Sequence, residues 1–265
     1  MADAAPRPRD AKALTASRSA PARALRLILA YDGTAYAGWQ VQPGVPTVQG
    51  LLLPAARALL GEEVGVTGAS RTDAGVHALR QTVSVHTTRA LPTDTVQRAL
   101  NAALPRDIRV VACDEAPPGF DARRAATGKR YGYLLQNGPV AAPFMLRYAW
   151  HVPTPLDIAA MREALAALRG RHDFSAFCAA AGRGHTPICV VRALRVVRRR
   201  ERVAVFVSAD RFLHHMVRNI VGSVVQVGRG ARTPAWLGEV LASRDRRRAG
   251  PTAPARGLTL VRVMY

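Results

Sequence analysis

The residues best suited to chemistry lie at positions 68–77, which read Gly-Ala-Ser-Arg-Thr-Asp-Ala-Gly-Val-His. Arg71 and Asp73 stand two residues apart among small side chains, and the stretches 63–67 and 81–86 predict strands on either side. A loop between strands presents a short acidic side chain on a rigid edge, where catalytic groups often lie. Arg71 can pair with Asp73 and hold its orientation. The alternative is an aspartate that only closes an Asx-turn.

A second candidate is Tyr131, in the stretch 129–135 that we expect to be a strand. Tyrosine has high β-propensity, so the simplest interpretation is a residue of the core or of the sheet surface. The functional alternative is a platform on which an extruded base stacks. Tyr133 shares the same face by parity, and we expect it to be structural.

The third candidate group is His214, His215 and Arg218, in the stretch 212–227 that we expect to be a helix ended by Gly228. On a helix, His214 and Arg218 share one face at i, i+4. Adjacent helical histidines point about 100° apart, which argues against a two-histidine metal site. The alternatives are a satisfied core histidine at position 215 and an exposed arginine at position 218.

Six segments, in order along the chain from about residue 25 to its end, resemble the motifs of the TruA family of tRNA pseudouridine synthases. They are 31–40 (Tyr-Asp-Gly-Thr-Ala-Tyr-Ala-Gly-Trp-Gln), 71–77 (Arg-Thr-Asp-Ala-Gly-Val-His), 120–123 (Phe-Asp-Ala-Arg), 129–133 (Lys-Arg-Tyr-Gly-Tyr), 212–222 (Phe-Leu-His-His-Met-Val-Arg-Asn-Ile-Val-Gly) and 257–261 (Gly-Leu-Thr-Leu-Val). One Arg-Thr-Asp tripeptide would mean little, whereas six ordered motifs indicate the family.

The resemblance implies an isomerase that converts uridine to pseudouridine at positions 38, 39 and 40 in the anticodon stem-loop of tRNA. It implies Asp73 as the catalytic carboxylate, with Arg71 beside it; attack on C1′, addition to C6 and abstraction of a sugar proton stay open as the role of Asp73. Tyr131 aligns with the base-stacking tyrosine of the family. Arg218 resembles its second active-site arginine, a partner for Asp73 or for a nearby phosphate. Leu258 corresponds to an apolar residue that floors the uracil pocket, with ordinary core as the alternative.

For the fold, the irregular alternation of strands and helices is typical of an α+β protein. The resemblance adds two similar βαβ-containing halves that form a central, mostly antiparallel sheet flanked by helices, with a cleft between the halves and a homodimer overall. We expect a disordered basic tail at 1–24, an N-terminal half with the catalytic loop at 25–114, and a C-terminal half at 115–265. A transit peptide fits the tail less well, because Asp3 and Asp10 are acidic.

Periodicity and end signals predict the remaining elements of both halves. The expected helices run from an N-cap at Thr47 to about 60, and over 93–104, 156–168 and 234–242; further strands are expected at 25–31, 108–113, 190–197, 203–208 and 258–264. Pro54 falls inside the first helix and should kink it or delay its start, because proline cannot donate a backbone hydrogen bond.

The charge of the chain points to its partner. Of 265 residues, 38 are Lys or Arg and 18 are Asp or Glu, a formal net charge of +20. This excess indicates a polyanion: RNA, DNA or an anionic membrane. Only Lys12 and Lys129 are lysines, so a genomic base-composition bias explains the choice of arginine but not the excess of cations. Candidate phosphate contacts are Arg23, Arg26, Arg123, Arg124 and the runs 198–202 and 244–248, although charged runs are by default solvated faces.

The sequence contains no phosphate-binding glycine motif and no metal-ligand motif, so we expect no cofactor and no metal. The three cysteines are too few and too scattered for a disulfide framework, and their odd number fits a reducing cytoplasm. Neither an apolar run of about 20 residues nor a secretion signal is apparent, so we expect a cytoplasmic protein that does not enter a membrane.

Three classes of function compete at this point. The first is a tRNA pseudouridine synthase, the second a catalytically silent RNA-binding protein on the same scaffold, and the third a nucleoside hydrolase that uses Asp73. The presence of both Asp73 and Tyr131 favours the enzyme over the silent protein. The strong basicity disfavours the hydrolase, since a free nucleoside needs no such field. We therefore expect tRNA to be the partner.

Overall fold

The computed structural model describes residues 23–179 and 186–265. In these residues the strands form one sheet in the order β4-β1-β3-β10-β5-β9-β8-β7, with β2 paired to β3 and β6 to β5. They are β1 (Arg23–Tyr31), β2 (Val66–Gly68), β3 (His77–Thr87), β4 (Ile108–Ala116), β5 (Gly128–Gln136), β6 (Trp150–His151), β7 (Gly170–Asp173), β8 (Ile188–Arg199), β9 (Arg202–Ala209) and β10 (Leu258–Met264). Only β10 with β3 and β5 with β6 pair in parallel, so the expected α+β fold with a mostly antiparallel sheet is confirmed.

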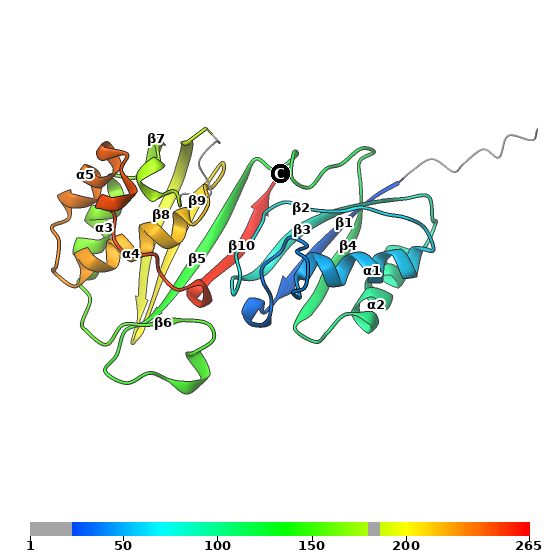
Figure 1. Cartoon of the computed structure of the whole chain (residues 1–265), viewed down its shortest axis with the longest axis horizontal. Helices are drawn as coiled ribbons and strands as arrows, with labels where there is room; N and C mark the ends of the chain where they lie inside the picture. The colour runs from blue at the N-terminus through cyan, green and yellow to red at the C-terminus, as the bar shows by residue number, and fades with distance from the viewer. Residues whose placement is uncertain (1–22, 180–185) are drawn as a thin grey trace, which may run out of the picture.

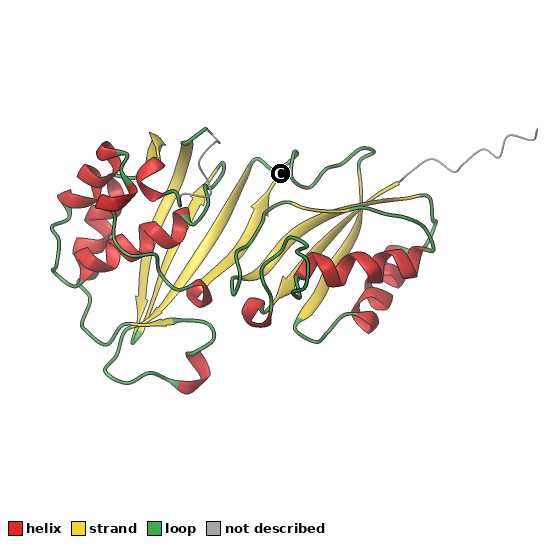
Figure 2. Cartoon of the chain, viewed as in Figure 1, coloured by secondary structure: helices red, strands yellow, loops and turns green. Residues whose placement is uncertain are grey.

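The helices stand in two groups along this sheet. They are α1 (Val48–Leu60), α2 (Thr93–Ala103), α3 (Ile158–Ala166), α4 (Met216–Gly228) and α5 (Ala235–Ser243). Figure 1 shows α1 and α2 at the end formed by β1 and β4, and α3, α4 and α5 at the end formed by β8 and β7. Figure 2 shows that loops cross the space between the two groups, where β10 and β5 lie. None of the described helices is both long and apolar enough to cross a membrane.

Helix α1 follows from its end signals and its apolar spacing. The Thr47 hydroxyl accepts a hydrogen bond from the Gly50 N–H at 3.1 Å, and Gly61 ends the helix with a left-handed φ of 61°. The buried positions repeat every four residues: Val48, Leu52, Ala56 and Leu60. Pro54 lies inside the helix, which nevertheless starts directly after Thr47. Of the two expected effects of Pro54, the delayed start is therefore wrong, and the kink stays a prediction.

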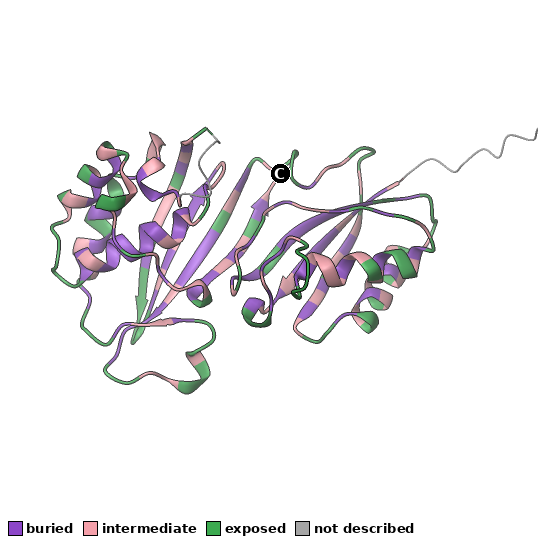
Figure 3. Cartoon of the chain, in the orientation of Figure 1, coloured by how far each residue is buried: buried purple, intermediate pink, exposed green. Residues whose placement is uncertain are grey.

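The core lies between the sheet and the two groups of helices (Figure 3). In β1, the alternating residues Leu25, Leu27 and Leu29 are at most 1% exposed, as the sequence predicts for this strand. Strand β10 comes from the C-terminus and pairs with both β3 and β5. The last strand of the chain therefore joins the N-terminal and C-terminal halves into one continuous sheet.

Several boundaries differ from those expected from the sequence. Arg23 and Ala24, expected in the tail, belong to β1, and the rest of the expected tail, residues 1–22, lies outside the described residues. Helix α4 begins at Met216 rather than at 212, because His215, directly before it, has a left-handed backbone. Gly228, expected just after this helix, is its last residue, and the left-handed glycine that follows is Gly230, with a φ of 73°.

Candidate active site

The loop that carries Asp73, residues 69–76, is fixed to β3 at its start. The side chain of Gln81, which is fully buried, accepts a hydrogen bond from the Ser70 N–H at 3.2 Å and donates to the Ser70 carbonyl at 2.5 Å. The Ala69 N–H donates to the Thr82 carbonyl at 2.8 Å. The Gln81 amide thus pairs with the backbone as a neighbouring strand would, and this determines where the loop leaves the sheet.

The segment 31–40 holds the middle of the same loop. The Trp39 N–H donates to the Thr72 carbonyl at 3.0 Å, and the hydroxyls of Thr72 and Tyr31 share a buried hydrogen bond of 2.8 Å. At Gly38 the φ is 96°, and a Cβ atom would lie 2.5 Å from the Thr72 carbonyl oxygen, so this close approach requires glycine. The segment therefore clamps the loop that presents Asp73.

The end of the loop is held by His77, which is buried. The Gly33 N–H lies 3.0 Å from its Nδ1, which is also 3.1 Å from a carboxylate oxygen of Asp32, and its Nε2 faces the carbonyls of Arg147 and Arg256 at 3.0 and 3.1 Å. These contacts join the loop that carries Asp73 to two segments that are distant in sequence. The role of His77 is structural.

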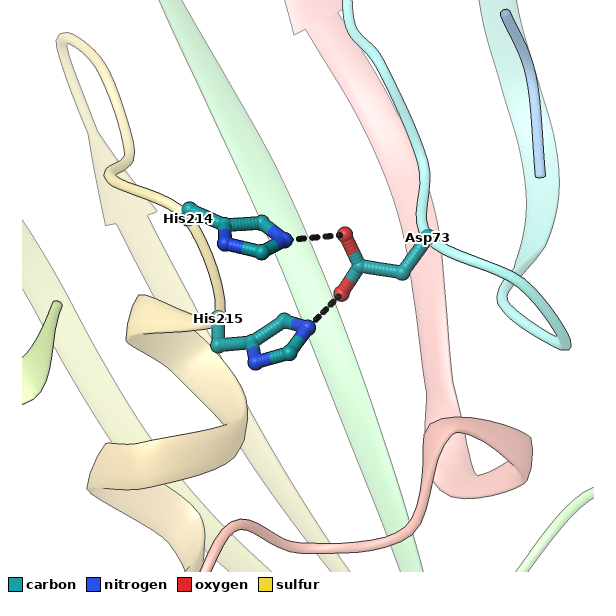
Figure 4. A group of neighbouring side chains, drawn as sticks. All are labelled: Asp73, His214 and His215. Carbon is teal, nitrogen blue, oxygen red and sulfur yellow. Dashed lines mark ion pairs between the residues drawn. The ribbon is translucent and has the colours of Figure 1, made fainter. Parts of the chain in front are cut away.

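The carboxylate of Asp73 meets three side chains from the segment that precedes and opens α4. The Nη1 of Arg218 donates to its Oδ2 at 3.1 Å, the Nε2 of His215 lies 3.4 Å from Oδ2, and the Nε2 of His214 lies 3.7 Å from Oδ1. Figure 4 shows both imidazole rings pointing at this carboxylate across the gap between the loop and the start of the helix. Three basic side chains thus surround one carboxylate.

The two histidines can face the same group because they are not helical. His215 has a left-handed backbone, with a φ of 61°, and α4 starts only at Met216. The imidazole rings of His214 and His215 lie side by side, with centroids 3.9 Å apart. The expected 100° divergence was wrong because it assumed a helix that began at 212. A non-glycine residue in the left-handed region is uncommon and marks a locally constrained backbone.

Arg218 is itself held in place by the segment around Ala253. Its Nε donates to the Ala253 carbonyl at 2.8 Å, and the Ala253 N–H donates to the Arg218 carbonyl at 3.1 Å. The segment around Ala253 lies directly on α4, since a Cβ atom on Gly222 would lie 1.6 Å from the Pro251 carbonyl oxygen. Two contacts therefore fix the guanidinium, and the side chain is only 15% exposed. The alternative of an exposed helix arginine at this position is wrong.

Tyr131 lies beside the same carboxylate, on β5. Its hydroxyl shares a hydrogen bond of 2.9 Å with the Ser70 hydroxyl. Its ring packs edge-to-face against the ring of Phe212, with the centroids 5.0 Å apart. Burial raises the pKa of Tyr131 to about 12. The phenol is therefore protonated at neutral pH. Burial lowers the pKa of His215 and so favours the neutral imidazole, although the nearby Asp73 acts in the opposite direction.

A cleft of about 1160 Å³ opens between the loop, β5 and the start of α4. All five predicted site residues line this cleft. Tyr131 and Leu258 are buried, Asp73 and Arg218 are half-buried, and Arg71 is exposed. In the described part of the chain no ion pair joins Arg71 to Asp73. The arginine that holds the carboxylate is Arg218, 145 residues further along the chain.

Comparison with known proteins agrees with this geometry. A family model described as tRNA pseudouridine synthase matches residues 27–123 and 164–265. The chain belongs to this family. It is 46% identical to the tRNA pseudouridine synthase A of Myxococcus xanthus over 242 residues, which is 91% of each protein. It is also 46% identical to the protein of that name from Moorella thermoacetica, over 91% of this chain and 99% of the relative.

Membership of the tRNA pseudouridine synthase family confirms the resemblance drawn from the six motifs, and with it the expectation of an isomerase.

The arginines expected to contact phosphate differ in their surroundings in the structure. Arg26 pairs with Asp114 at 3.1 Å, and Arg23 pairs with Glu115. Arg246, from the run 244–248, is not a solvated residue, because it donates to the side chains of Asn219 and Thr252 at 3.0 Å each. Arg123 lines the cleft.

Sequence reasoning missed the residues of the synthase that position the loop, above all Gln81, Tyr31 and Thr72. Each is polar and at most 7% exposed, so each needs a partner inside the protein. An available signal was the polar residue Gln81 at the start of the expected strand 81–86. Its partner, the backbone of Ser70, could not be named without the tertiary structure.

Proposed function

We propose that this synthase converts uridine to pseudouridine at positions 38, 39 and 40 in the anticodon stem-loop of tRNA. The observation that carries the proposal is the presentation of Asp73, held by Arg218 at 3.1 Å, in a cleft that Tyr131 and Leu258 also line. The names of the relatives give tRNA as what those proteins act on. The net charge of +20 suits a polyanionic substrate.

The reaction is an isomerisation, in which the bond between C1′ and N1 breaks and a bond between C1′ and C5 forms. The proton on C5 is lost and N1 gains one, so neither an oxidant nor a phosphate donor is consumed. A fixed carboxylate suits chemistry that passes through an oxocarbenium-like state at C1′. Asp73 supplies that group, while the apolar side chain of Leu258 and the ring of Tyr131 supply flat and apolar surface for the uracil. Catalysis by these residues requires no metal and no cofactor.

Access to the cleft requires that the target base leave its stack. Base-modifying enzymes extrude the target nucleotide into a pocket and stack it against aromatic or apolar side chains. Arg71 and Arg123 lie at the same cleft and carry the charge to meet the flanking phosphates. We assign Arg71 this role beside Asp73. The ion pair with Asp73 itself belongs to Arg218.

The test is pseudouridine formation on unmodified tRNA, mapped by carbodiimide-dependent stops of reverse transcription. Conversion is expected at positions 38, 39 and 40, and a tRNA with cytidine at these positions should give no product. Asp73→Asn keeps the size and the turn-forming ability of the residue, so folding and tRNA affinity should persist while conversion is lost. Wild-type conversion by this variant would return Asp73 to the role of a turn residue. Excess EDTA should leave conversion intact, provided that the tRNA stays folded.

The same assay separates the competing functions. A silent RNA-binding protein would bind tRNA without conversion, and a nucleoside hydrolase would release uracil from free uridine.

We further propose that the synthase acts in the cytoplasm as a homodimer, as the resemblance to the family implies. Sedimentation equilibrium should give about twice the chain mass of 28.5 kDa. A monomer at assay concentration would contradict the proposed homodimer and leave the proposed reaction standing.

A further inference from the structure

Asp73, His214 and His215 form a cluster at the cleft that could bind a metal ion, which the isomerisation does not require. One ring nitrogen of His214, one of His215 and a carboxylate oxygen of Asp73 all lie within 4.8 Å of one another. Two imidazoles and one carboxylate are a donor set that zinc and similar divalent ions bind in proteins. The side chains of the three are between 25% and 38% exposed, so a cation can reach them from solvent.

The separations fit a shared ion. Ligand atoms about 2.0 Å from a tetrahedral zinc ion lie about 3.3 Å from one another. His215 lies 3.4 Å from Oδ2 and His214 lies 3.7 Å from Oδ1, and one ligand atom from each of the three residues lies within 4.8 Å of the others, so closing movements of at most about 1.5 Å would bring them to this spacing. Figure 4 shows that both rings already present the same nitrogen to the carboxylate. The left-handed backbone at His215 is what brings the two neighbouring rings into this arrangement.

Arg218 opposes a cation here, but it does not occupy the whole carboxylate. Its one bond to Asp73 is to Oδ2, at 3.1 Å, whereas Oδ1 faces His214. An ionised carboxylate has about four lone-pair sites, so Oδ2 can keep its bond to Arg218 while Oδ1 binds a metal ion. Carboxylates that bind metals are commonly hydrogen-bonded in this way by an outer partner.

We propose that Asp73, His214 and His215 form an inhibitory site for a divalent transition-metal ion of the zinc class. The ion binds in the free enzyme and occupies the carboxylate that conversion of uridine needs. Mg²⁺, which prefers oxygen ligands and octahedral geometry, does not bind there. Metal binding itself is independent of the proposed function; only the inhibition rests on it.

The binding test uses full-length protein without RNA. Zn²⁺ is titrated in competition with a chromophoric chelator, and Co²⁺ is added in parallel to read the visible absorption that reports its coordination number. One Zn²⁺ per chain is expected, with the Co²⁺ spectrum of a four-coordinate site. His214→Gln and His215→Gln should each weaken binding at least tenfold, and the double variant should abolish it. His86→Gln, which removes an exposed histidine on β3, is the matched control and should bind as wild type does.

The inhibition test follows pseudouridine formation in excess Mg²⁺, with Zn²⁺ added and then removed by EDTA. Wild type and His86→Gln should be inhibited and then recover, whereas the double variant should be insensitive, measured against its own uninhibited rate. Zinc affinity unchanged in the double variant would overturn the site, and so would the absence of one-to-one binding. Tight binding by wild type with no inhibition would overturn the inhibitory role. An enzyme that converts no tRNA would refute the proposed function and leave the binding result standing.

Discussion

Replacement of Arg218 by methionine tests whether this arginine, rather than Arg71, positions the carboxylate of Asp73, which we propose to be catalytic. The substitution keeps an unbranched apolar stem in a largely buried position and removes the guanidinium. It breaks two bonds, one to Asp73 at 3.1 Å and one to the Ala253 carbonyl at 2.8 Å. The neighbouring histidines remain, so Asp73 keeps two partners but loses the one that is itself fixed at both ends.

The magnitude follows from these two bonds. Both bonds have the charged guanidinium as donor, and such a hydrogen bond contributes about 1.5–3 kcal/mol when it is fully buried. Asp73 is a quarter exposed and water replaces part of the lost interaction, while the methionine recovers some apolar contact. The net cost in unfolding free energy is therefore about 1–2 kcal/mol, which a domain of this size tolerates. The same interaction, lost from the transition state, lowers the rate about 10–30-fold, because about 1.4 kcal/mol corresponds to a factor of ten.

The assay pairs urea unfolding with pseudouridine formation under single-turnover conditions. Arg98→Met is the matched control, because it breaks an Arg–Asp pair of 3.2 Å whose side chains are 75% and 68% exposed. The control should cost at most about 0.5 kcal/mol and leave the rate unchanged. Arg218→Lys should fall between wild type and methionine, since lysine keeps the charge but not the planar fork. An Arg218→Met enzyme with the stability and rate of wild type would refute the positioning role.

Four further outcomes are expected. Tyr131→Ala should fold and lose most turnover, since stacking of one base contributes about 1–3 kcal/mol, and wild-type turnover would make the residue merely structural. The difference in absorbance at 295 nm between wild type and Tyr131→Phe should titrate near pH 12. Because that pKa lies above the unfolded value, Tyr131 stabilises the fold below pH 10, and this contribution is lost as the pH rises to 12; titration near pH 10 would contradict its burial. Gln81→Leu should slow single turnover more than Gln81→Glu does at a pH where the acid is protonated, because only leucine leaves the Ser70 backbone unpaired; equal rates would exclude the anchor. Affinity for tRNA should fall steeply with salt and weaken on removal of residues 1–22, without loss of activity; a salt-independent Kd would exclude the electrostatic account.

Local structure and the identity of the reactive side chains can be predicted from the sequence of this protein alone. Helix α1 follows from the cap at Thr47 and from apolar spacing, and strand β1 follows from alternation, because both depend on neighbours within a few residues. The motif around Asp73 and the tyrosine at position 131 were identified for the same reason. A motif is contiguous, so it can be read without knowing what lies opposite.

Which of these side chains contact one another depends on the tertiary structure. Asp73 pairs with Arg218 rather than with the adjacent Arg71, because the order of strands places the start of α4 across the cleft from the loop. The two histidines converge on the same carboxylate because one left-handed residue, His215, delays the start of the helix. Such contacts join residues more than a hundred positions apart, and their geometry is fixed by sheet register and helix ends. Neither is encoded in the spacing of residues along the chain.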